Sequence, residues 1–412
     1  MKISAIDSYV LTIPTPQPMA RSYAHQKLVV AEIATDEGVK GLGYSLVFGG
    51  GGAEAVLAYL QARLAPALLG EDPLGVRALW EKMFRTDMGI KKQGIAAYAL
   101  AALDIGLWDI AGKAARMPLY RMWGAVADRI PAYGSGGWSK YSEAELIAEA
   151  ERYAAQGCRY YKMKIHHPDA LENRKRVEAV RRALGGGVRL MVDVNQRLDP
   201  LASIRQARAL EDLDLVWYEE PVLADDIAGC AEVARAIGIP VATGENNYTC
   251  FEFRELIERR AARYLMPDVC RALGFSETLR IGHLAAAHQV ALAPHVLSLH
   301  VVGALSTDSS SSSSTGPRPI SSRKRPSART GTSRYRTARA TAWRLRKARA
   351  RNTEAPESPD EPPTADAGRR PSMLVLTDLN RRLRSGYLLF NPLFINRMPW
   401  RAFEDPDEML AP

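Results

Sequence analysis

The sequence predicts an α/β protein in which a (β/α) barrel follows a small N-terminal α+β domain. From about residue 126 onward, short apolar runs alternate with amphipathic helical patterns, as expected for parallel strands joined by helices. Polar residues close successive apolar runs at intervals of about one βα unit. Both regularities stop after residue 305, so we expect the eighth strand and the C-terminal part of the barrel to be disrupted.

Residues 1–125 form the predicted N-terminal domain. Two runs of strand-forming residues, KISAIDSYVLTI and KLVVAEIAT, precede turn residues that lead into a third strand. Helical patterns follow at 53–68, 74–85 and 93–115, and Met117-Pro118 ends the last of them. Strands followed by helices indicate an α+β unit.

Residues 126–305 form the predicted barrel domain. Apolar runs and helical patterns alternate there in the order YYKMKI and 169–184, VRLMVDV and 200–212, LVWYEEP and 225–237, PVATGEN and 251–262, YLMPDV and 275–288, with VALAPHV last. Six polar residues end these runs, spaced 29, 26, 26, 23 and 27 residues apart: Lys164, Asp193, Glu219, Glu245, Asp268 and His295. Because the carboxyl ends of barrel strands meet at one face, we expect these side chains to surround one pocket.

The carboxylates Asp193, Glu219 and Glu245 end three consecutive strands. Each one alone is more simply explained as a helix N-cap or a salt-bridge partner. Three in register would repel one another, and a divalent cation removes that repulsion. Hard oxygen ligands suit Mg²⁺, so the pattern favours a magnesium site. Asn195 shares the strand face of Asp193 and is expected to hydrogen-bond within this site.

The strand RYYKMKIHH directs Lys162 and Lys164 to one face and apolar side chains to the other. Lysine is rarely buried without a partner, so both ammonium groups are expected to enter the pocket of carboxylates. Lys164 is placed to act as a general base, and the like charge of Lys162 should lower its pKa. Asp268 and His295, on adjacent strands, suit a second base whose imidazole is oriented by a carboxylate.

A metal between two bases suits one class of reaction. A substrate carboxylate binds Mg²⁺, a base removes the α-proton, and the metal stabilises the resulting enediolate. The sequence therefore predicts an enzyme that acts on a small carboxylate.

Residues 1–305 resemble the mandelate racemase subgroup of the enolase superfamily. The segments that carry the resemblance are KMK (162–164), VDVNQ (192–196), EEP (219–221), GEN (244–246), MPDV (266–269), PH (294–295) and, at the joint between the domains, GKAARMPLYRMWGA (112–125). The resemblance implies a modified TIM barrel with an N-terminal capping domain and often a homo-oligomer. It implies the metal ligands named above, Lys164 and the His295–Asp268 dyad as the bases, and Lys162 as a modulator.

The resemblance also implies that the capping domain selects the substrate. That role would fall on the loop 14–26, with Arg21, Tyr23 and His25 as substrate-binding residues, and on the glycine loop 47–52. Dehydration of a sugar acid is the favoured reaction, with His295 expelling the β-hydroxyl group as an acid. Racemisation or epimerisation of a 2-hydroxy acid, which uses both bases from opposite faces, is the alternative.

The chain departs from the family pattern in three places. After the sixth strand the family usually has Lys-x-Gly-Gly, whereas this chain has CRALGF, in which only Gly274 is kept. The segment after His295, HVLSLHVVGAL, is about three residues shorter than expected. The eighth strand and its usual Glu, which hydrogen-bonds the substrate carboxylate, should follow shortly after residue 305.

The formal net charge of +9 is localised. Residues 306–370 contain 15 Lys or Arg and 6 Asp or Glu, so the rest of the chain has 40 of each and is neutral. We expect 306–372 to be disordered and 373–412 to pack on the capping domain. A second hypothesis is an inactive barrel whose basic tail binds a polyanion, for which salt-dependent retention on DNA is the discriminating test. Because the tail has no nucleic-acid motif, we expect no nucleic-acid partner.

The remaining features indicate a cytoplasmic protein without a membrane segment. The first residues show no signal-peptide pattern, and the most apolar stretch, 95–112, is interrupted by Asp104 and Asp109. The four cysteines (158, 230, 250 and 270) are scattered, as is typical of reduced thiols.

We hypothesise that the reading frame is disrupted after residue 305 and restored between about 370 and 390, because PLFINRMPWRAFEDP again resembles a family C-terminus. Translating the other two frames of the DNA should then give an apolar strand followed by Glu. If neither frame does so, the hypothesis is wrong.

Overall fold

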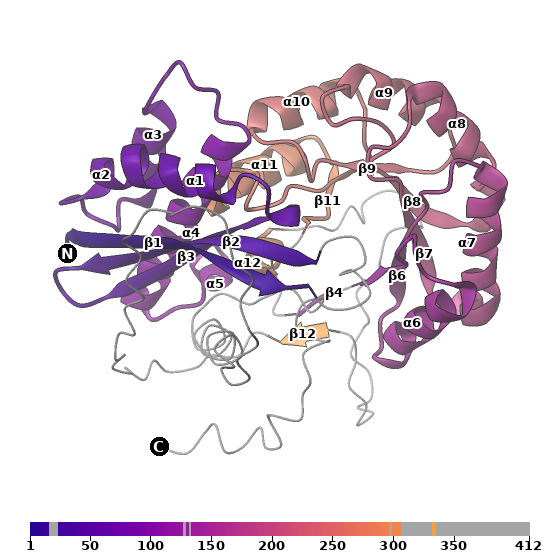
Figure 1. Ribbon diagram of the computed structural model, residues 1–412, viewed down its shortest axis with the longest axis horizontal. Helices are drawn as coiled ribbons and strands as arrows, with labels where there is room; N and C mark the ends of the chain where they lie inside the picture. Colours follow the sequence, from indigo (N-terminus) through magenta and orange to yellow (C-terminus); the bar gives the residue numbers. More distant parts are fainter. Residues whose placement is uncertain (16–23, 127–128, 132, 296–298, 306–331, 335–412) are drawn as a thin grey trace, which may run out of the picture.

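The computed structural model describes residues 1–15, 24–126, 129–131, 133–295, 299–305 and 332–334 (Figure 1). It contains a three-stranded antiparallel sheet with its helices and a seven-stranded parallel sheet with helices on its outer side. The predicted α/β architecture is confirmed.

The N-terminal sheet has the order β1-β2-β3. Its elements and those that follow are β1 (Ile3–Pro14), β2 (His25–Thr35), β3 (Lys40–Val47), the short 3₁₀ turn η2 (Phe48–Gly50), α1 (Ala53–Tyr59), the π-helical turn η3 (Leu60–Leu64), α2 (Ala65–Leu68), α3 (Val76–Arg85), α4 (Ile95–Ala115) and α5 (Leu119–Met122).

Strand β2 is apolar on both faces because both faces of this sheet are covered. Val29, Ala31 and Ile33 pack with α1, α3 and α4, whereas Leu28 and Val30 belong to a core shared with the barrel. Helix α4 is long and apolar enough to span a membrane, but most of it is buried inside the protein. It is therefore the central core helix of this domain.

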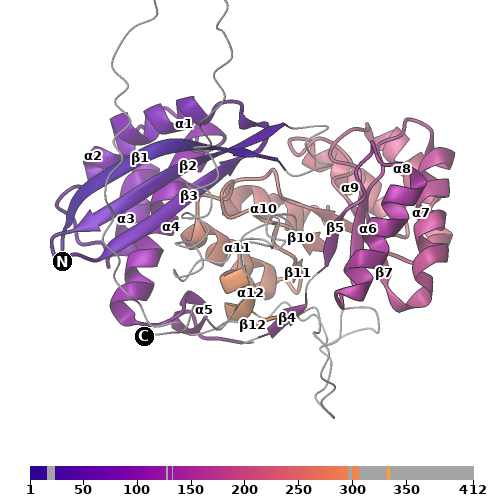
Figure 2. The same cartoon turned by 60° about the horizontal axis from the view of Figure 1, so that its bottom comes forward.

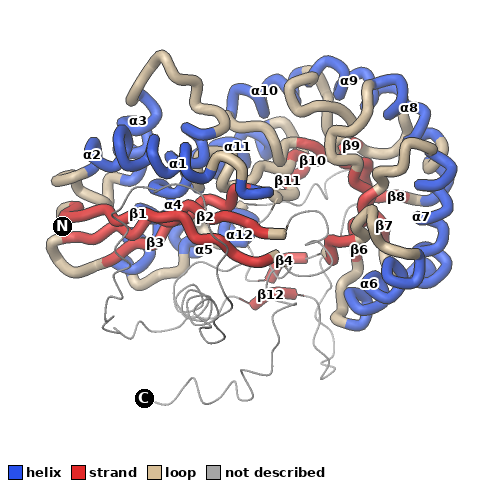
Figure 3. The backbone as a smooth tube through the Cα atoms, in the orientation of Figure 1, coloured by secondary structure: helices blue, strands red, loops and turns tan. Residues whose placement is uncertain are grey.

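The parallel sheet has the order β11-β10-β9-β8-β7-β6-β5, and Figure 3 shows its strands following one another in a curved row. The strands are β5 (Gly134–Gly136), β6 (Tyr160–Lys164), β7 (Arg189–Asp193), β8 (Leu215–Glu219), β9 (Val241–Thr243), β10 (Tyr264–Leu265) and β11 (Ala291–Leu292). The helices between and after them are α6 (Glu143–Ala155), α7 (Ala170–Leu184), α8 (Pro200–Arg208), α9 (Ile227–Ala236), α10 (Cys250–Glu258), α11 (Phe275–Ala287) and α12 (Leu299–Ala304), with 3₁₀ turns η4 (Gly185–Gly187) and η5 (Glu211–Leu213).

The sheet ends at β11, and no eighth strand connects it to β5 within the ranges described above. Three residues of the basic segment form β12 (Thr332–Arg334), which pairs antiparallel with β4 (Arg129–Pro131) and was not predicted. The rest of 306–372 and all of 373–412 lie outside the described residues, so the expectations for those segments stay predictions.

Helix α11 is the barrel helix that lies against α3 and α4 (Figure 2). Its N-cap residue, Gly274, has no side chain, and Asp104 of α4 takes the place of a cap. The Asp104 carboxylate accepts hydrogen bonds from the Ser276 backbone N–H (3.0 Å) and from its hydroxyl (2.6 Å). A Cβ atom at Gly274 would lie 2.3 Å from Asp104 Oδ2, so this contact requires glycine. The two domains are thus joined by a helix cap that crosses between them.

The free energy of unfolding should depend on the ionisation of Asp104. Burial raises its pKa to about 7, above the value of about 3.8 that the unfolded chain would have. The folded protein therefore holds a proton that the unfolded chain releases, and stability falls as the pH rises from about 4 to about 7. Asp104→Asn keeps an acceptor for Ser276 and removes this titration.

Urea unfolding at pH 5.5 and pH 8 tests this expectation. From pH 5.5 to pH 8, the free energy of unfolding of Asp104→Asn should rise by about 2 kcal/mol relative to that of the parent. Asp212→Asn, at an exposed carboxylate, is the control. An Asp104→Asn difference that stays constant with pH would contradict the shifted pKa.

Candidate active site

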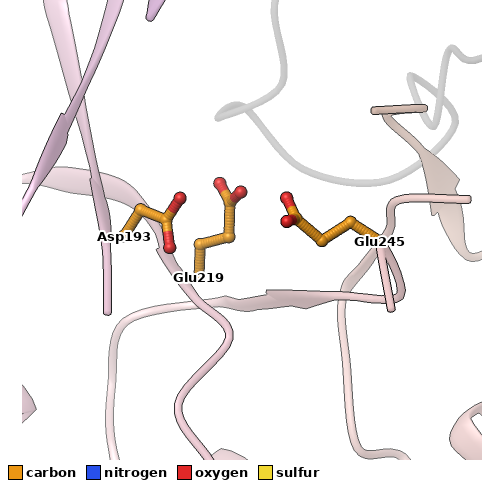
Figure 4. A group of neighbouring side chains, drawn as sticks. All are labelled: Asp193, Glu219 and Glu245. Atoms are coloured by element: carbon orange, nitrogen blue, oxygen red, sulfur yellow. The ribbon is translucent and has the colours of Figure 1, made fainter. Parts of the chain in front are cut away.

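Three carboxylates at neighbouring strand ends form the centre of the candidate site. Asp193 is the last residue of β7, Glu219 is the last residue of β8, and Glu245 follows β9. All three are buried, and one oxygen of each lies within 4.8 Å of the others. Figure 4 shows the carboxylates pointing toward one another. The strand ends therefore bring these residues together as their spacing predicts.

One oxygen of each carboxylate is held by a neighbouring donor. The contacts are the Asn195 backbone N–H with Asp193 Oδ1 (2.9 Å), the Trp217 indole N–H with Glu219 Oε2 (2.8 Å) and the Arg271 guanidinium with Glu245 Oε1 (3.4 Å). The other oxygen of Glu245, Oε2, is buried without a hydrogen-bond partner. Such donors fix the direction of a carboxylate.

Both lysines of β6 enter this cluster. Lys162 donates to Glu219 Oε1 and lies 3.5 Å from Asp193 Oδ2, and Lys164 donates to the same oxygen of Asp193. Both side chains are almost fully buried. The interpretation that β6 directs two ammonium groups at the carboxylates agrees with this geometry.

Burial and the neighbouring charges shift the pKa values of the carboxyl groups in the cluster. Burial would raise the pKa of Asp193, but the charges of Lys164 and Lys162 outweigh burial and lower it. Burial and the charge of Asp193 raise the pKa of Glu219 to about 8. A cation among these oxygens would favour the ionised form of Glu219, and the cluster therefore has the electrostatics of a metal site.

His295 and Asp268 lie at the opposite side of the cluster from β6. They form a parallel β-bridge, and His295 Nδ1 lies 2.8 Å from Asp268 Oδ2. The other ring nitrogen, Nε2, lies 3.3 Å from Glu245 Oε2. Burial would raise the pKa of Asp268, but Arg271 and the bond to His295 outweigh it and lower the pKa. An ionised Asp268 accepts a hydrogen bond from Nδ1–H, and Nε2 then faces the carboxylates.

Asn195 lies beside Asp193, as expected from their shared strand face. Its side-chain N–H donates to Asp193 Oδ2 (3.2 Å), and its carbonyl oxygen lies 3.0 Å from His166 Nε2. The φ angle of Asn195 is +48°, in the left-handed region that asparagine tolerates better than most residues.

Of the predicted substrate residues, Arg21 and Tyr23 lie outside the described residues, and His25 is exposed at the beginning of β2. The glycine loop does reach the site through Phe48, whose ring centroid lies 6.4 Å from that of His295.

Several site residues were not identified from the sequence. The ammonium of Lys162 lies 5.5 Å from the ring centroid of Tyr133, and that of Lys164 lies 5.8 Å from Trp138. These aromatic residues flank β5, which is too short to give an apolar run. Trp217 could have been found, because it precedes Glu219 by two residues and so shares its strand face.

Glu220 was also missed as a buried group. Its Oε1 accepts hydrogen bonds from the side chains of Asn246 (2.6 Å) and Gln196 (3.1 Å), and its Oε2 is buried without a partner. Burial, Glu245 and Asp193 raise its pKa well above the usual value. Glu220 lies outside the group of three converging carboxylates.

The donor set fits Mg²⁺. All three converging side chains supply hard oxygen atoms, and the buried, unpartnered Oε2 of Glu245 is an acceptor that a cation would satisfy. Asp193 and Glu219 would supply the other two oxygens.

Both parts of the chain match known family descriptions. Residues 5–124 match "Mandelate racemase / muconate lactonizing enzyme, N-terminal domain", and residues 145–333 match "Enolase C-terminal domain-like".

Curated relatives include sugar-acid enzymes. The chain is 35% identical over 269 residues to 3,6-anhydro-alpha-L-galactonate cycloisomerase of Streptomyces coelicolor, covering 65% of this chain and 74% of the relative. It is 36% identical over 269 residues to L-talarate/galactarate dehydratase of Salmonella typhimurium, covering 65% and 67%. Arabinonate dehydratase of Saccharolobus solfataricus is 32% identical over 291 residues, covering 68% and 78%.

Solved structures also resemble this chain in fold and sequence. A racemase from Streptomyces coelicolor with bound magnesium has a TM-score of 0.71 and 32% identity, covering 74% of this chain and 87% of that chain. L-Talarate dehydratase from Polaromonas, complexed with Mg and L-glucarate, has a TM-score of 0.69 and 34% identity, covering 74% and 84%. The expected resemblance is confirmed: this chain belongs to the mandelate racemase subgroup of the enolase superfamily.

Proposed function

We propose that this protein is a Mg²⁺-dependent enzyme that removes the α-proton of a 2-hydroxy carboxylate, with dehydration of a sugar acid as its reaction. The observation that carries the proposal is the buried group of three carboxylates with a candidate base at each side. Lys164 contacts Asp193 at one side, and His295 Nε2 lies 3.3 Å from Glu245 at the other. The sugar-acid dehydratases and the magnesium-bound structures among the relatives support the same assignment.

Asp193, Glu219 and Glu245 would hold the metal ion. When bound, Mg²⁺ supplies the positive charge that stabilises the carboxylate of the substrate as its α-proton leaves. Donors on the opposite oxygens of Asp193 and Glu219 keep both carboxylates directed at the site. Lys164 and Lys162, which donate to the remaining oxygens, would have to move aside for the ion.

Lys164 would accept the α-proton on one face of the substrate. Its ammonium lies over the Trp138 ring, which restricts its position next to Asp193. Burial would lower the pKa of Lys162, but Glu219 and the other surrounding groups outweigh burial and raise it. Lys162 therefore stays charged and acts on Lys164 as a fixed cation.

His295 would act on the opposite face. Asp268 accepts a hydrogen bond from Nδ1–H, which orients the ring so that a proton on Nε2 can be delivered to a leaving β-hydroxyl group. Racemisation or epimerisation is the alternative, in which the bases on opposite sides of the carboxylates exchange the α-proton on the two faces of the substrate. Both reactions use the same residues and differ in the fate of the β-hydroxyl group.

A screen of the full chain against a library of sugar acids, with and without Mg²⁺, tests the proposed function. Dehydration yields a 2-keto-3-deoxy acid, whereas racemisation returns an isomer of the starting acid. Turnover of no library member in the presence of Mg²⁺ would oppose both reactions. The cytoplasmic location, the homo-oligomer and the contacts of Arg21, Tyr23 and His25 with substrate remain parts of this proposal.

Replacement of Glu219 should weaken Mg²⁺ binding. Glu219→Gln removes one carboxylate of the three and leaves Lys162 with Asp193 as its carboxylate partner. Calorimetry should show Mg²⁺ affinity lost or reduced by at least tenfold. Glu220→Gln is the matched control, because it changes a neighbouring buried carboxyl outside the group and keeps an acceptor for Asn246 and Gln196. Unchanged affinity of Glu219→Gln would remove Glu219 from the ligand set.

The two bases should be separable by isotope exchange. Lys164→Ala should abolish exchange of the α-proton with D₂O from one face, and His295→Asn from the other, while both variants still bind Mg²⁺. The measurement is deuterium incorporation into each enantiomer of an accepted substrate. Loss of exchange from both enantiomers in one variant, with metal and substrate binding intact, would show that the bases do not act on opposite faces. Unchanged exchange in both variants would show that Lys164 and His295 have only a structural role.

A further inference from the structure

We propose that Arg271 is a positioning residue that fixes Glu245 and Asp268 and connects both to the N-terminal domain. The inference rests on the proposed function, because it assigns these two residues to the metal site and to the second base. Arg271 lies in CRALGF, the segment in which the chain departs from the family pattern. Its side chain is buried, with 6% exposed, and it contacts four side chains from four different segments.

The first contact orients Glu245. Arg271 Nη1 donates to the Glu245 backbone carbonyl (2.8 Å) and lies 3.4 Å from the side-chain oxygen Oε1. Backbone and side chain of Glu245 are thus held by one nitrogen. Oε2 makes no hydrogen bond and lies 3.3 Å from His295 Nε2.

The second contact orients the base. Arg271 Nη1 lies 3.9 Å from Asp268 Oδ2, the oxygen that also faces His295 Nδ1. The Arg271 and Cys270 backbone N–H groups donate to the other oxygen, Oδ1 (3.2 and 2.7 Å). Asp268 therefore has both oxygens fixed, and its alignment with His295 depends on the segment that contains Arg271.

The remaining contacts come from the N-terminal domain. Arg271 Nε donates to the Tyr98 hydroxyl on α4 (3.1 Å), and the guanidinium carbon lies 5.7 Å from the Phe48 ring centroid in η2. The planar guanidinium group can stack on a ring and donate in several fixed directions at once, which an ammonium group cannot do. The positions of Glu245 and Asp268 therefore depend, through Arg271, on the positions of α4 and η2.

The test uses the full chain and two readouts, Mg²⁺ affinity by calorimetry and kcat on an accepted acid. Arg271→Met should weaken Mg²⁺ binding at least tenfold and lower kcat further, since it releases both Glu245 and Asp268. Arg271→Lys keeps the charge and should recover only part of each loss. Tyr98→Phe, which touches neither carboxylate, should weaken Mg²⁺ binding about threefold.

A double variant separates positioning from general destabilisation. Tyr98→Phe combined with Arg271→Met should be no worse than Arg271→Met alone, because Tyr98 acts through Arg271. Gln93→Met removes another hydrogen bond between the domains, to Glu252, and should leave both readouts unchanged. If Arg271→Met does not fold, the effect of Tyr98→Phe on Mg²⁺ affinity still shows whether Arg271 acts as a positioning residue.

The outcomes distinguish this inference from the proposed function. A parent protein that does not bind Mg²⁺ would oppose the proposed function itself. A parent that binds Mg²⁺, with Tyr98→Phe and Gln93→Met indistinguishable from it, would overturn the role of Arg271 alone.

Discussion

Mutual repulsion of three buried carboxylates is the constraint on which the rest of this structure depends. Asp193, Glu219 and Glu245 come within 4.8 Å of one another because parallel strands end at a common edge. Buried like charges at this distance are costly without compensation. Each carboxylate accordingly has its own cation, Lys164, Lys162 and Arg271 respectively. A divalent metal ion would offset the remaining negative charge of the three carboxylates, which gives the cluster a role as a metal site.

The N-terminal domain makes several buried contacts with the part of the barrel that carries the candidate site. Its sheet packs on the barrel through one face, and Asp104 caps the barrel helix α11. The Trp80 indole N–H donates to the Leu273 carbonyl (3.0 Å), just before that helix. Residues 268–276 thus lie between the second base and the N-terminal domain, with Arg271 in their middle. The two domains are therefore mechanically coupled at the site.

The sequence was sufficient to predict the ring of strand-end residues. Period-two alternation placed Lys162 and Lys164 on one face, and regular βα spacing brought Asp268 next to His295. Residues held by tertiary contacts could not be predicted in this way. Arg271 follows a strand on an irregular turn, so neither period applies to it. Helix α6 was missed although Ser142 and Glu145 form a capping box that marks its start.

Local chemistry also altered one predicted helix. The continuous helix expected at 53–68 contains the π-helical turn η3 instead. Pro66 has no N–H to donate to residue 62, and its ring would crowd that carbonyl, so a wider turn before it relieves the conflict. The parallel sheet ends at β11 within the described residues, and the expected disruption of the eighth strand stays a prediction, because nearly all of the chain after residue 305 lies outside them.

Anomalous scattering from crystals of the full chain soaked in Mn²⁺, as a substitute for Mg²⁺, tests whether the three carboxylates hold a divalent ion. One strong peak is expected at coordination distance from Asp193, Glu219 and Glu245, with Lys162 and Lys164 beside it and His295 opposite. A peak at other residues, or none at these three under saturating Mn²⁺, would show that the cluster is not a metal site.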